Sequence, residues 1–215
     1  MKIVTTWSGE CFTAKHVQAL QLQCEKYAPL ADFICITPEF IPGVDCRPGT
    51  HRWPGWWHKY EVFAPHIRGT VLYMDIDTVI RGSLEDITAV KHLTLLRDFY
   101  RDGKKLKEGL QASLMLLPEA DRAEVWEDWM RHPSVHMQRL GHKGDQPMLE
   151  QHYMSRAQKW QDVVPGQIVS WKVDCGGDVN LFRPTTPVVP PDARLIVFHG
   201  RPRPWEHPYF EDLYR

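Results

Sequence analysis

The stretch that decides the fold is VLYMDIDTV, residues 71–79. It begins with apolar and aromatic residues and then carries two carboxylates, Asp75 and Asp77. Because side chains alternate along an extended chain, residues two positions apart point to the same side. We therefore expect a buried strand at Thr70–Met74 that runs into two carboxylates, which face the same way if the extended conformation continues through them.

Two like charges held this close repel each other unless a cation or a proton lies between them. Carboxylate oxygens are the ligands that Mg²⁺ and Mn²⁺ take, with positions left open for phosphate oxygens. In open α/β sheets, ligands bind beyond the carboxyl ends of the strands, where Asp75 and Asp77 would lie. The pair thus predicts a divalent-cation site. The alternative is that Asp75 and Asp77 merely begin a polar turn.

Short apolar runs alternate with helical periods along the chain, which predicts an α/β layer fold. The expected strands are Lys2–Thr6, Phe33–Thr37, Thr70–Met74, Leu93–Leu96, Ala112–Leu117, Val179–Phe182 and Leu195–Phe198. The expected helices are Thr13–Tyr27, Trp57–Pro65, Glu119–Arg131 (with Ala123, Trp126 and Met130 on one face) and Asp145–Ala157. Residues 38–57 are rich in Pro, Gly and Trp and are expected to form a long loop, of the kind that is often functional.

Length and composition narrow the classes of protein. A chain of 215 residues is expected to form one domain. With 25% charged residues and a net charge of -1, it lacks the basic excess of a general nucleic-acid binder. We find no run of ~20 apolar residues that would span a bilayer and no signal-peptide pattern, and we expect a cytoplasmic protein. The five cysteines form no CxxC pair, so neither a disulfide framework nor a zinc site is expected.

A wider stretch around the two carboxylates resembles a known family. The segments GWWHKYEVF (residues 55–63) and RGTVLYMDIDTVIRGSL (residues 68–84) resemble the GT-A glycosyltransferases. They are most similar to the group called family 8, which includes glycogenin and bacterial galactosyltransferases. The strong similarity covers residues 55–87. It implies an α/β, Rossmann-like fold that binds nucleotide sugars, with a mixed, mostly parallel central sheet and residues 1–215 as a single domain.

Two later motifs extend the resemblance on the sugar side of the site. LQASLML (residues 110–116) stands where the family has a strand whose polar residues face the donor sugar. GDQPML (residues 144–149) resembles the family's "DQdvLN" motif, in which the Asp and Gln lie against the transferred sugar. The resemblance therefore implies that Asp145 and Gln146 are catalytic residues.

The last motif is VFHGRPRPW, residues 197–205, which resembles the family's "HFxGxxKPW". There the His is the third metal ligand and the Lys grips the donor diphosphate. In this chain the family's His position aligns with Val197, and His199 follows two residues later, on the same face of a strand. Arg203 replaces the Lys, keeps its charge and can bind phosphate in a bidentate manner.

The resemblance implies transfer of a sugar from a nucleotide-diphosphate-sugar donor, most simply a UDP-sugar, to a carbohydrate or other hydroxyl acceptor. It also implies retention of anomeric configuration and a need for Mn²⁺ or Mg²⁺. The implied metal ligands are Asp75, Asp77 and His199. The implied donor-binding residues are Thr5, Thr6, Trp7, Lys59, Asp75, Ile76, Gly200 and Arg203.

Several roles stay open at this stage. Trp7 either stacks on the base or packs in the core, and His199 either reaches the metal or is a buried histidine. The loop with Trp53, Trp56 and Trp57 is either a sugar platform or lid, or an anchored loop. An inverting enzyme would need a general base, for which Asp145 and Asp178 are candidates.

Two other functions share the same letters. DIDTV (residues 75–79) also fits the nucleophile loop of haloacid-dehalogenase-type phosphatases, with Asp75 as nucleophile, Mg²⁺ bound, and Lys143 and Asp145 as later motifs. In that family the nucleophile strand usually opens the domain, whereas about 70 residues precede it here. The third possibility is an inactive relative that binds nucleotide sugars.

Overall fold

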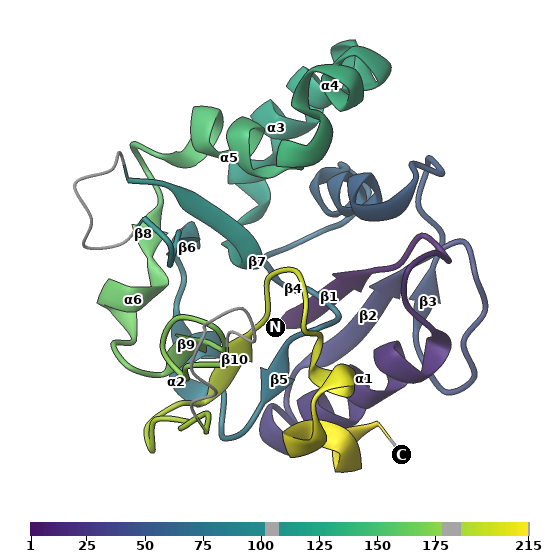
Figure 1. Cartoon of the computed structure of the whole chain (residues 1–215). Coiled ribbons are helices and arrows are strands. Elements are labelled where there is room, and N and C mark those ends of the chain that lie inside the picture. The colour runs from purple at the N-terminus through teal and green to yellow at the C-terminus, as the bar shows by residue number, and fades with distance from the viewer. Residues whose placement is uncertain (102–107, 178–185, 215) are drawn as a thin grey trace.

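The computed structural model describes residues 1–101, 108–177 and 186–214. The predicted strand Val179–Phe182 and the candidate base Asp178 lie outside these residues. The central sheet has seven strands in the order β3-β2-β1-β4-β7-β6-β8, and Figure 1 labels them on the ribbon. They are β1 (Lys2–Thr6), β2 (Asp32–Ile36), β3 (Cys46–Arg47), β4 (Val71–Met74), β6 (Thr94–Arg97), β7 (Leu110–Leu117) and β8 (Gln158–Lys159).

The sheet is mixed and mostly parallel, which confirms the expected fold class. β1 pairs in parallel with β2 and β4, whereas β7 is antiparallel to both β4 and β6. The register sets Lys2 opposite Val71 and Val4 opposite Tyr73. β1 and β4 therefore end at the same edge of the sheet, and the segments that follow them meet there.

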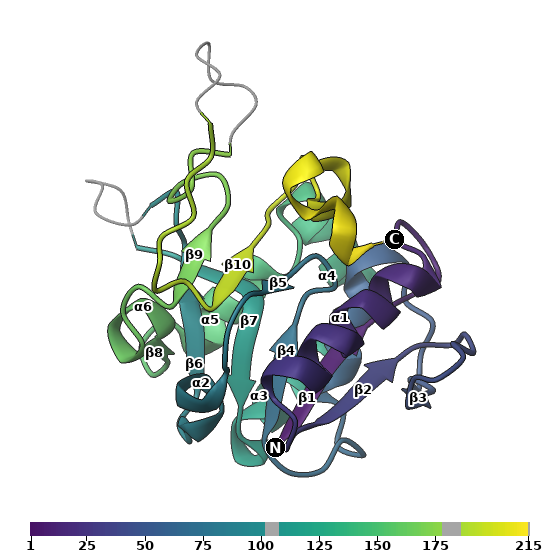
Figure 2. The ribbon, with the colours of Figure 1, turned by 90° about the horizontal axis from the view of Figure 1, so that it is seen from below.

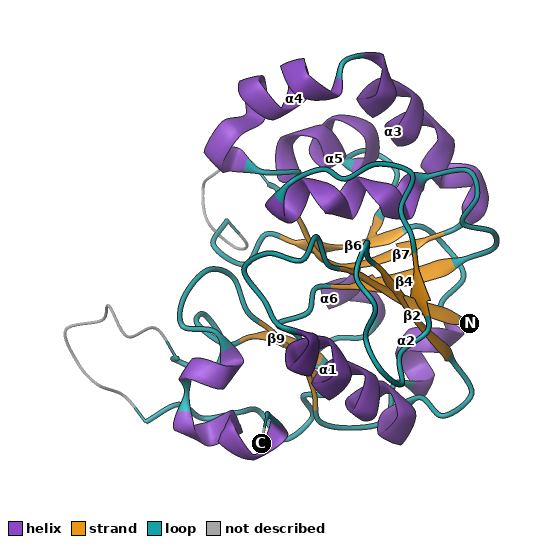
Figure 3. Cartoon of the chain, turned by 90° about the vertical axis from the view of Figure 1, so that its right-hand side faces the viewer, coloured by secondary structure: helices purple, strands orange, loops and turns teal. Residues whose placement is uncertain are grey.

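Helices cover both faces of this sheet, as Figure 3 shows. The helical elements are α1 (Ala14–Tyr27), η1 (Gly55–Phe63), α2 (Glu85–Ala89), α3 (Glu119–Arg131), α4 (Pro133–Leu140), η2 (Gly141–Lys143), α5 (Gln146–Tyr153), α6 (Trp160–Val163), η3 (Pro204–Glu206) and η4 (Pro208–Leu213). One apolar cluster joins one face of the sheet to η1, α3 and α5. A second cluster joins the opposite face to α1, α2 and α6.

A smaller sheet carries the last part of the chain to the edge where β4 ends. It has the order β5-β10-β9, formed by Val79–Ile80, Leu195–Val197 and Ile168–Ser170 (Figure 2). β5 begins two residues after Asp77, and β10 runs antiparallel to it with Ile196 opposite Val79. The residues that follow β10 are thereby led back past Asp77.

The short helix predicted over Trp57–Pro65 is the 3₁₀-helix η1, which begins two residues earlier, at Gly55, and ends at Phe63. With three residues per turn, side chains at positions i and i+3 lie in one row. Trp57, Tyr60 and Phe63 form one row, which is buried in the core. Trp56 and Lys59 form the next row, which lines a cavity.

Other helix predictions need small corrections. Glu119–Arg131 is helical as predicted, but the buried residues of α3 are Arg122, Val125 and Trp129, one position off the expected face. Arg122 tolerates burial because its guanidinium donates to the backbone oxygens of Val62 and Gly69. The predicted helix Asp145–Ala157 is shorter, since α5 spans Gln146–Tyr153 and Gln158–Lys159 joins the sheet as β8. No helix within the described ranges is long and apolar enough to cross a membrane.

Candidate active site

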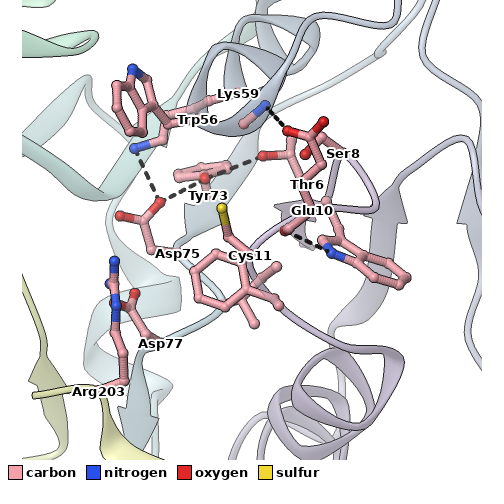
Figure 4. Close-up of a pocket in the computed structure, with 14 residues that line it drawn as sticks. Thr6, Ser8, Glu10, Cys11, Trp56, Lys59, Tyr73, Asp75, Asp77 and Arg203 are labelled. Atoms are coloured by element: carbon pink, nitrogen blue, oxygen red, sulfur yellow. Dashed lines mark hydrogen bonds and ion pairs between the residues drawn. The ribbon is translucent and has the colours of Figure 1, made fainter. Parts of the chain in front are cut away.

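A cavity opens where β1, β4 and η1 come together, and Figure 4 shows its side chains. The loop after β1 forms one wall and the end of β4 forms another, with η1 beside it and Arg203 at the edge. The predicted site residues Thr6, Trp7, Lys59, Asp75, Ile76, Asp77 and Arg203 all line this cavity. Residues far apart in the sequence thus meet at the carboxyl ends of two parallel strands, as expected for a ligand site in an α/β sheet.

Asp75 is held in place by two neighbours. The Tyr73 hydroxyl donates to Asp75 Oδ1 at 2.7 Å, and Lys59 Nζ lies 3.0 Å from the same oxygen. The Asp75 side chain is still 27% exposed. Asp75 therefore offers the cavity a fixed carboxylate with an accessible side.

Lys59 is a buried cation that ties together two parts of the site. Its Nζ lies 2.9 Å from Asp145 Oδ2 as well as 3.0 Å from Asp75 Oδ1, and its side chain is 9% exposed. Burial alone would lower the pKa of Lys59, but Asp145 and Asp75 outweigh burial and raise it well above its ordinary value. Lys59 is therefore charged and joins the loop after β4 to the start of α5.

Asp77 is paired with a different cation, Arg203, whose Nη1 contacts Asp77 Oδ2. The Asp77 side chain is 3% exposed and that of Arg203 is 30% exposed. Burial raises the pKa of Asp77 to about 6, although Arg203 acts in the opposite direction. A deeply buried carboxylate and a partly exposed arginine thus meet at the edge of the cavity.

The C-terminal segment is fastened to the fold next to Arg203. The Trp205 indole stacks on His16 at the start of α1, with ring centroids 3.8 Å apart. Phe12 packs edge-on against Trp205, and the Arg203 guanidinium lies 5.5 Å from the centre of the Phe12 ring. These aromatic contacts fix the chain around Arg203 and leave its side chain at the cavity.

The wall formed by the end of β1 contains residues that sequence reasoning missed. Beyond Thr6 and Trp7, the cavity is lined by Ser8 and by residues 10–12. Glu10 Oε2 accepts a hydrogen bond from the Gly55 backbone N–H at 3.0 Å and so joins this loop to η1. The available signal was position, because residues just after a parallel strand lie where ligands bind. Trp7 is half-buried at this wall, and Thr5 is fully buried within β1.

His199 and Gly200 follow β10, and the side chain of His199 contacts Ser170 and Phe99. His199 Nε2 is 2.8 Å from Ser170 Oγ, and its ring stacks on Phe99. Burial lowers the pKa of His199 to about 4, so the ring is neutral near pH 7. Gly200 is exposed. Within the described residues, neither one lines the cavity that holds Asp75 and Asp77.

Gln146 belongs to a neighbouring polar network. Its Nε2 donates to Asp98 Oδ2 at 3.0 Å, and Arg101 Nε donates to the same oxygen at 2.7 Å. Arg101 also pairs with Glu150 of α5. The predicted catalytic pair is therefore split: Asp145 is bound to Lys59, and Gln146 is held by the network around Asp98.

Solved structures of glycosyltransferases share this fold. The glycosyltransferase GlyE of Streptococcus pneumoniae TIGR4 matches 99% of this chain with a TM-score of 0.64 at 13% identity. The galactosyltransferase LgtC, solved with donor and acceptor sugar analogs, matches 100% of this chain and 95% of its own, with a TM-score of 0.55 at 15% identity. The bifunctional glycosyltransferase WbbM matches 99% of this chain with a TM-score of 0.63 at 12% identity. The chain has the GT-A fold.

Two of these glycosyltransferases are much longer than this chain. The chain spans 59% of the length of GlyE and 48% of that of WbbM. No protein-family model matches the chain, and neither does any curated protein. The resemblance seen in residues 55–87 is thus confirmed as a likeness of fold.

The carboxylates of this GT-A fold suit a divalent cation. Asp75 and Asp77 supply oxygen ligands of the kind that Mg²⁺ and Mn²⁺ take. Among the residues that the structure describes, no group of three or more His, Cys, Asp or Glu side chains is gathered as a metal site. The donor set fits a cation held by two carboxylates, whose other ligands are phosphate oxygens and water.

Proposed function

We propose that this chain is a glycosyltransferase, a single domain over residues 1–215, that moves a sugar from a nucleotide-diphosphate-sugar donor to a hydroxyl acceptor. A UDP-sugar is the simplest donor, and a divalent metal and retention of anomeric configuration are part of the proposal. The observation that carries it is the charge arrangement at one cavity. Asp75 and Asp77 lie there beside two cationic side chains, Lys59 and Arg203, at the carboxyl ends of β1 and β4.

This arrangement suits a diphosphate leaving group. When the bond between the sugar and the diphosphate breaks, negative charge develops on the leaving phosphate and must be neutralised. Arg203 would offer two N–H donors to a phosphate, and Lys59 would supply a second, fixed positive charge. A divalent metal on Asp75 and Asp77 would act as a Lewis acid on the phosphate oxygens. Thr6, Trp7 and Ser8 would hold the nucleoside at the other wall.

On the sugar side we assign Asp145 and Gln146 to the transferred sugar. Asp145 is 15% exposed and its orientation is fixed by Lys59. Gln146 is held by Asp98 and can present its amide oxygen. Both residues would then orient sugar hydroxyls, and the acceptor would react on the face of the sugar that they leave open.

The phosphatase alternative is weakened by the position of its lysine. That reading needs Lys143 beside the nucleophile, but Lys143 is exposed, and the lysine that contacts Asp75 is Lys59. The GT-A fold of the chain also differs from a domain opened by its nucleophile strand.

The test is calorimetry of UDP and a panel of nucleotide sugars, with Mn²⁺ and with a chelator. We expect heat of binding with Mn²⁺ and at least about a tenfold loss of affinity in Asp77→Asn, because the variant keeps the shape and loses the charge. The control is Asp45→Asn, which removes a surface carboxylate that is also paired with an arginine, Arg47.

Two results would contradict the proposal. One is the absence of nucleotide binding with either Mg²⁺ or Mn²⁺. The other is hydrolysis of p-nitrophenyl phosphate that depends on Asp75, which would support the phosphatase. Binding of a nucleotide sugar without any turnover, including donor hydrolysis, would indicate the inactive relative.

A further inference from the structure

The three tryptophans Trp53, Trp56 and Trp57, of which the last two lie in η1, differ in how deeply they are buried. Trp53 and Trp57 are 8% and 7% exposed and belong to the core. Trp53 stacks on His51 and Trp57 stacks on Trp129. Trp56 is 55% exposed and lines the cavity. Anchoring therefore accounts for two of the three indoles and leaves Trp56 to be explained.

The 3₁₀ geometry of η1 decides where Trp56 lies. Trp56 and Lys59 are three residues apart, so they stand one above the other on the same side of the helix. Lys59 forms the buried end of this row, against Asp75, and Trp56 forms its exposed end. Figure 4 shows the Trp56 indole above Asp75, on the side of the cavity away from Thr6 and Ser8.

The backbone around Trp56 is fixed on both sides. Gly55 has a φ of 53°, a conformation that favours glycine, and its N–H is held by Glu10. A Cβ added to Gly144 would lie 3.8 Å from Trp56 Nε1, so the edge of the indole borders the residue that precedes Asp145. The indole thus stands between the loop after β1 and the start of α5.

An exposed indole at the mouth of a polar cavity suits one kind of ligand. A pyranose ring has one face made mainly of C–H groups, which pack on an aromatic ring, while its hydroxyl edge bonds to polar side chains. Ligand cavities commonly combine aromatic walls with a few polar groups in this way. The charged floor of Lys59, Asp75, Asp77 and Arg203 is suited to phosphates, and Trp56 lies outside that floor.

We propose that Trp56 is the platform on which a pyranose unit of the acceptor stacks, so that the acceptor is a sugar or a glycoside. This inference rests on the proposed function, because the nucleotide sugar is assigned to the floor and to the β1 wall. Trp56 then determines acceptor specificity, and the acceptor hydroxyl is presented next to Asp145.

The experiment measures two ligands separately. UDP binding with Mn²⁺ is followed by calorimetry, and methyl glycosides of common hexopyranoses are followed by saturation-transfer NMR with UDP and Mn²⁺ present. We expect Trp56→Ala to keep UDP affinity within about twofold and to weaken glycoside binding by about tenfold. Trp56→Phe should retain part of the binding, since it keeps an aromatic face. Phe40→Ala is the control, because Phe40 is an 83% exposed aromatic side chain outside the cavity.

The outcomes separate this inference from the proposed function. If UDP binds and glycosides bind equally well to wild type and Trp56→Ala, or bind to neither, the inference fails and the proposed function stands. If Trp56→Ala loses UDP binding and keeps glycoside binding, Trp56 stacks on the base and the inference also fails. If wild type binds no nucleotide but binds glycosides through Trp56, the platform stands and the proposed function fails.

Discussion

Two segments bring a cation to the same pair of carboxylates, and they do so in different ways. Lys59 comes from η1, is 9% exposed, and contacts both Asp75 and Asp145. Arg203 comes from the C-terminal segment, is 30% exposed, and contacts Asp77. The difference indicates that Lys59 is part of the folded framework, and we expect Arg203, which borders the cavity, to exchange Asp77 for a ligand.

Aromatic packing fixes η1, the segment that carries Lys59. In the neighbouring row of η1, Tyr60 stacks on Trp129 with ring centroids 3.8 Å apart. Arg203 has anchors on either side in the chain, His199 and Trp205, but its own side chain borders the cavity. Removing each charge in turn therefore tests whether Lys59 and Arg203 differ in role.

The largest effect is expected from Lys59→Met. The variant leaves two partly buried carboxylates, Asp75 and Asp145, without their shared cation. Removing one partner of a buried ion pair costs about 3–5 kcal/mol. The measurement is the free energy of unfolding in urea. Arg203→Met leaves Asp77, which is 3% exposed, without its cation, but burial already raises the pKa of Asp77 to about 6, so the carboxylate can take up a proton and the cost should be about 1–2 kcal/mol. Lys143→Met changes an exposed lysine and should cost less than about 0.5 kcal/mol. Equal losses in the first two variants would contradict the distinction between a fixed and a mobile cation.

A second effect concerns ligand binding, where Arg203 should matter most. Arg203→Met is expected to weaken binding of UDP with Mn²⁺ by about 10–100-fold, because hydrogen bonds to charged groups contribute about 1.5–3 kcal/mol. Calorimetry measures this change. The matched control is Arg201→Met, which removes an 85% exposed arginine of the same segment that pairs with Glu206. Unchanged affinity in Arg203→Met would mean that Arg203 serves only to neutralise Asp77.

The parts of the site also differ in how well the sequence predicts them, as β4 and η1 show. Apolar residues before Asp75 indicated β4, and the usual position of ligand sites in α/β sheets indicated that the carboxylates lie at a site. β4 ends at Met74 and the Thr78 N–H donates to the Asp75 backbone oxygen, so the two carboxylates stand on a turn and not on the extended chain that strand alternation requires. The row of Trp56 and Lys59 depended on η1 being a 3₁₀-helix, which the residues alone did not indicate. The ion pair of Lys59 with Asp145 joins positions 86 residues apart, counted as 145 less 59, so only the tertiary structure shows it.

The C-terminal motif, residues 197–205, shows most clearly where prediction from the sequence fails. The resemblance implied that His199 lies beside the metal, on the argument that a shift of two residues keeps the same face of a strand. In the structure β10 ends at Val197, and His199 bonds to Ser170, so the strand argument does not extend to this residue. The role of His199 as a metal ligand stays a prediction, as does the role of every other site residue. Arg203 reached the cavity because the antiparallel pairing of β10 with β5 leads the chain past Asp77.

A third effect tests His199 as an anchor of the C-terminal segment. Burial, with Lys172 acting in the same direction and Asp98 against it, lowers the pKa of His199 from 6.5 to about 4. Between these values the unfolded chain binds a proton that the folded chain does not, so stability is full above about pH 6.5 and falls as pH falls toward 4. From pH 7 to pH 5 we expect this group to contribute a loss of roughly 2 kcal/mol, or about 4–8 °C in Tm. His199→Gln should flatten that part of the thermal-melting profile, and His92→Gln, at an exposed position, should not.

The smallest expected effect concerns Mn²⁺ binding and tests Arg203 alone. In the absence of nucleotide, Arg203 and a divalent metal compete for Asp77, because both neutralise the same buried carboxylate. Arg203→Met should therefore bind Mn²⁺ alone a few-fold more tightly than wild type, by about 1 kcal/mol or less, although the same variant binds UDP with Mn²⁺ more weakly. Electron paramagnetic resonance of unbound Mn²⁺ measures the first affinity without any turnover. Opposite changes in the two affinities would mean that Arg203 moves from Asp77 to the diphosphate when the donor binds. A parallel loss of both would mean that Arg203 supports the metal site as a fixed part of the fold, as Lys59 does.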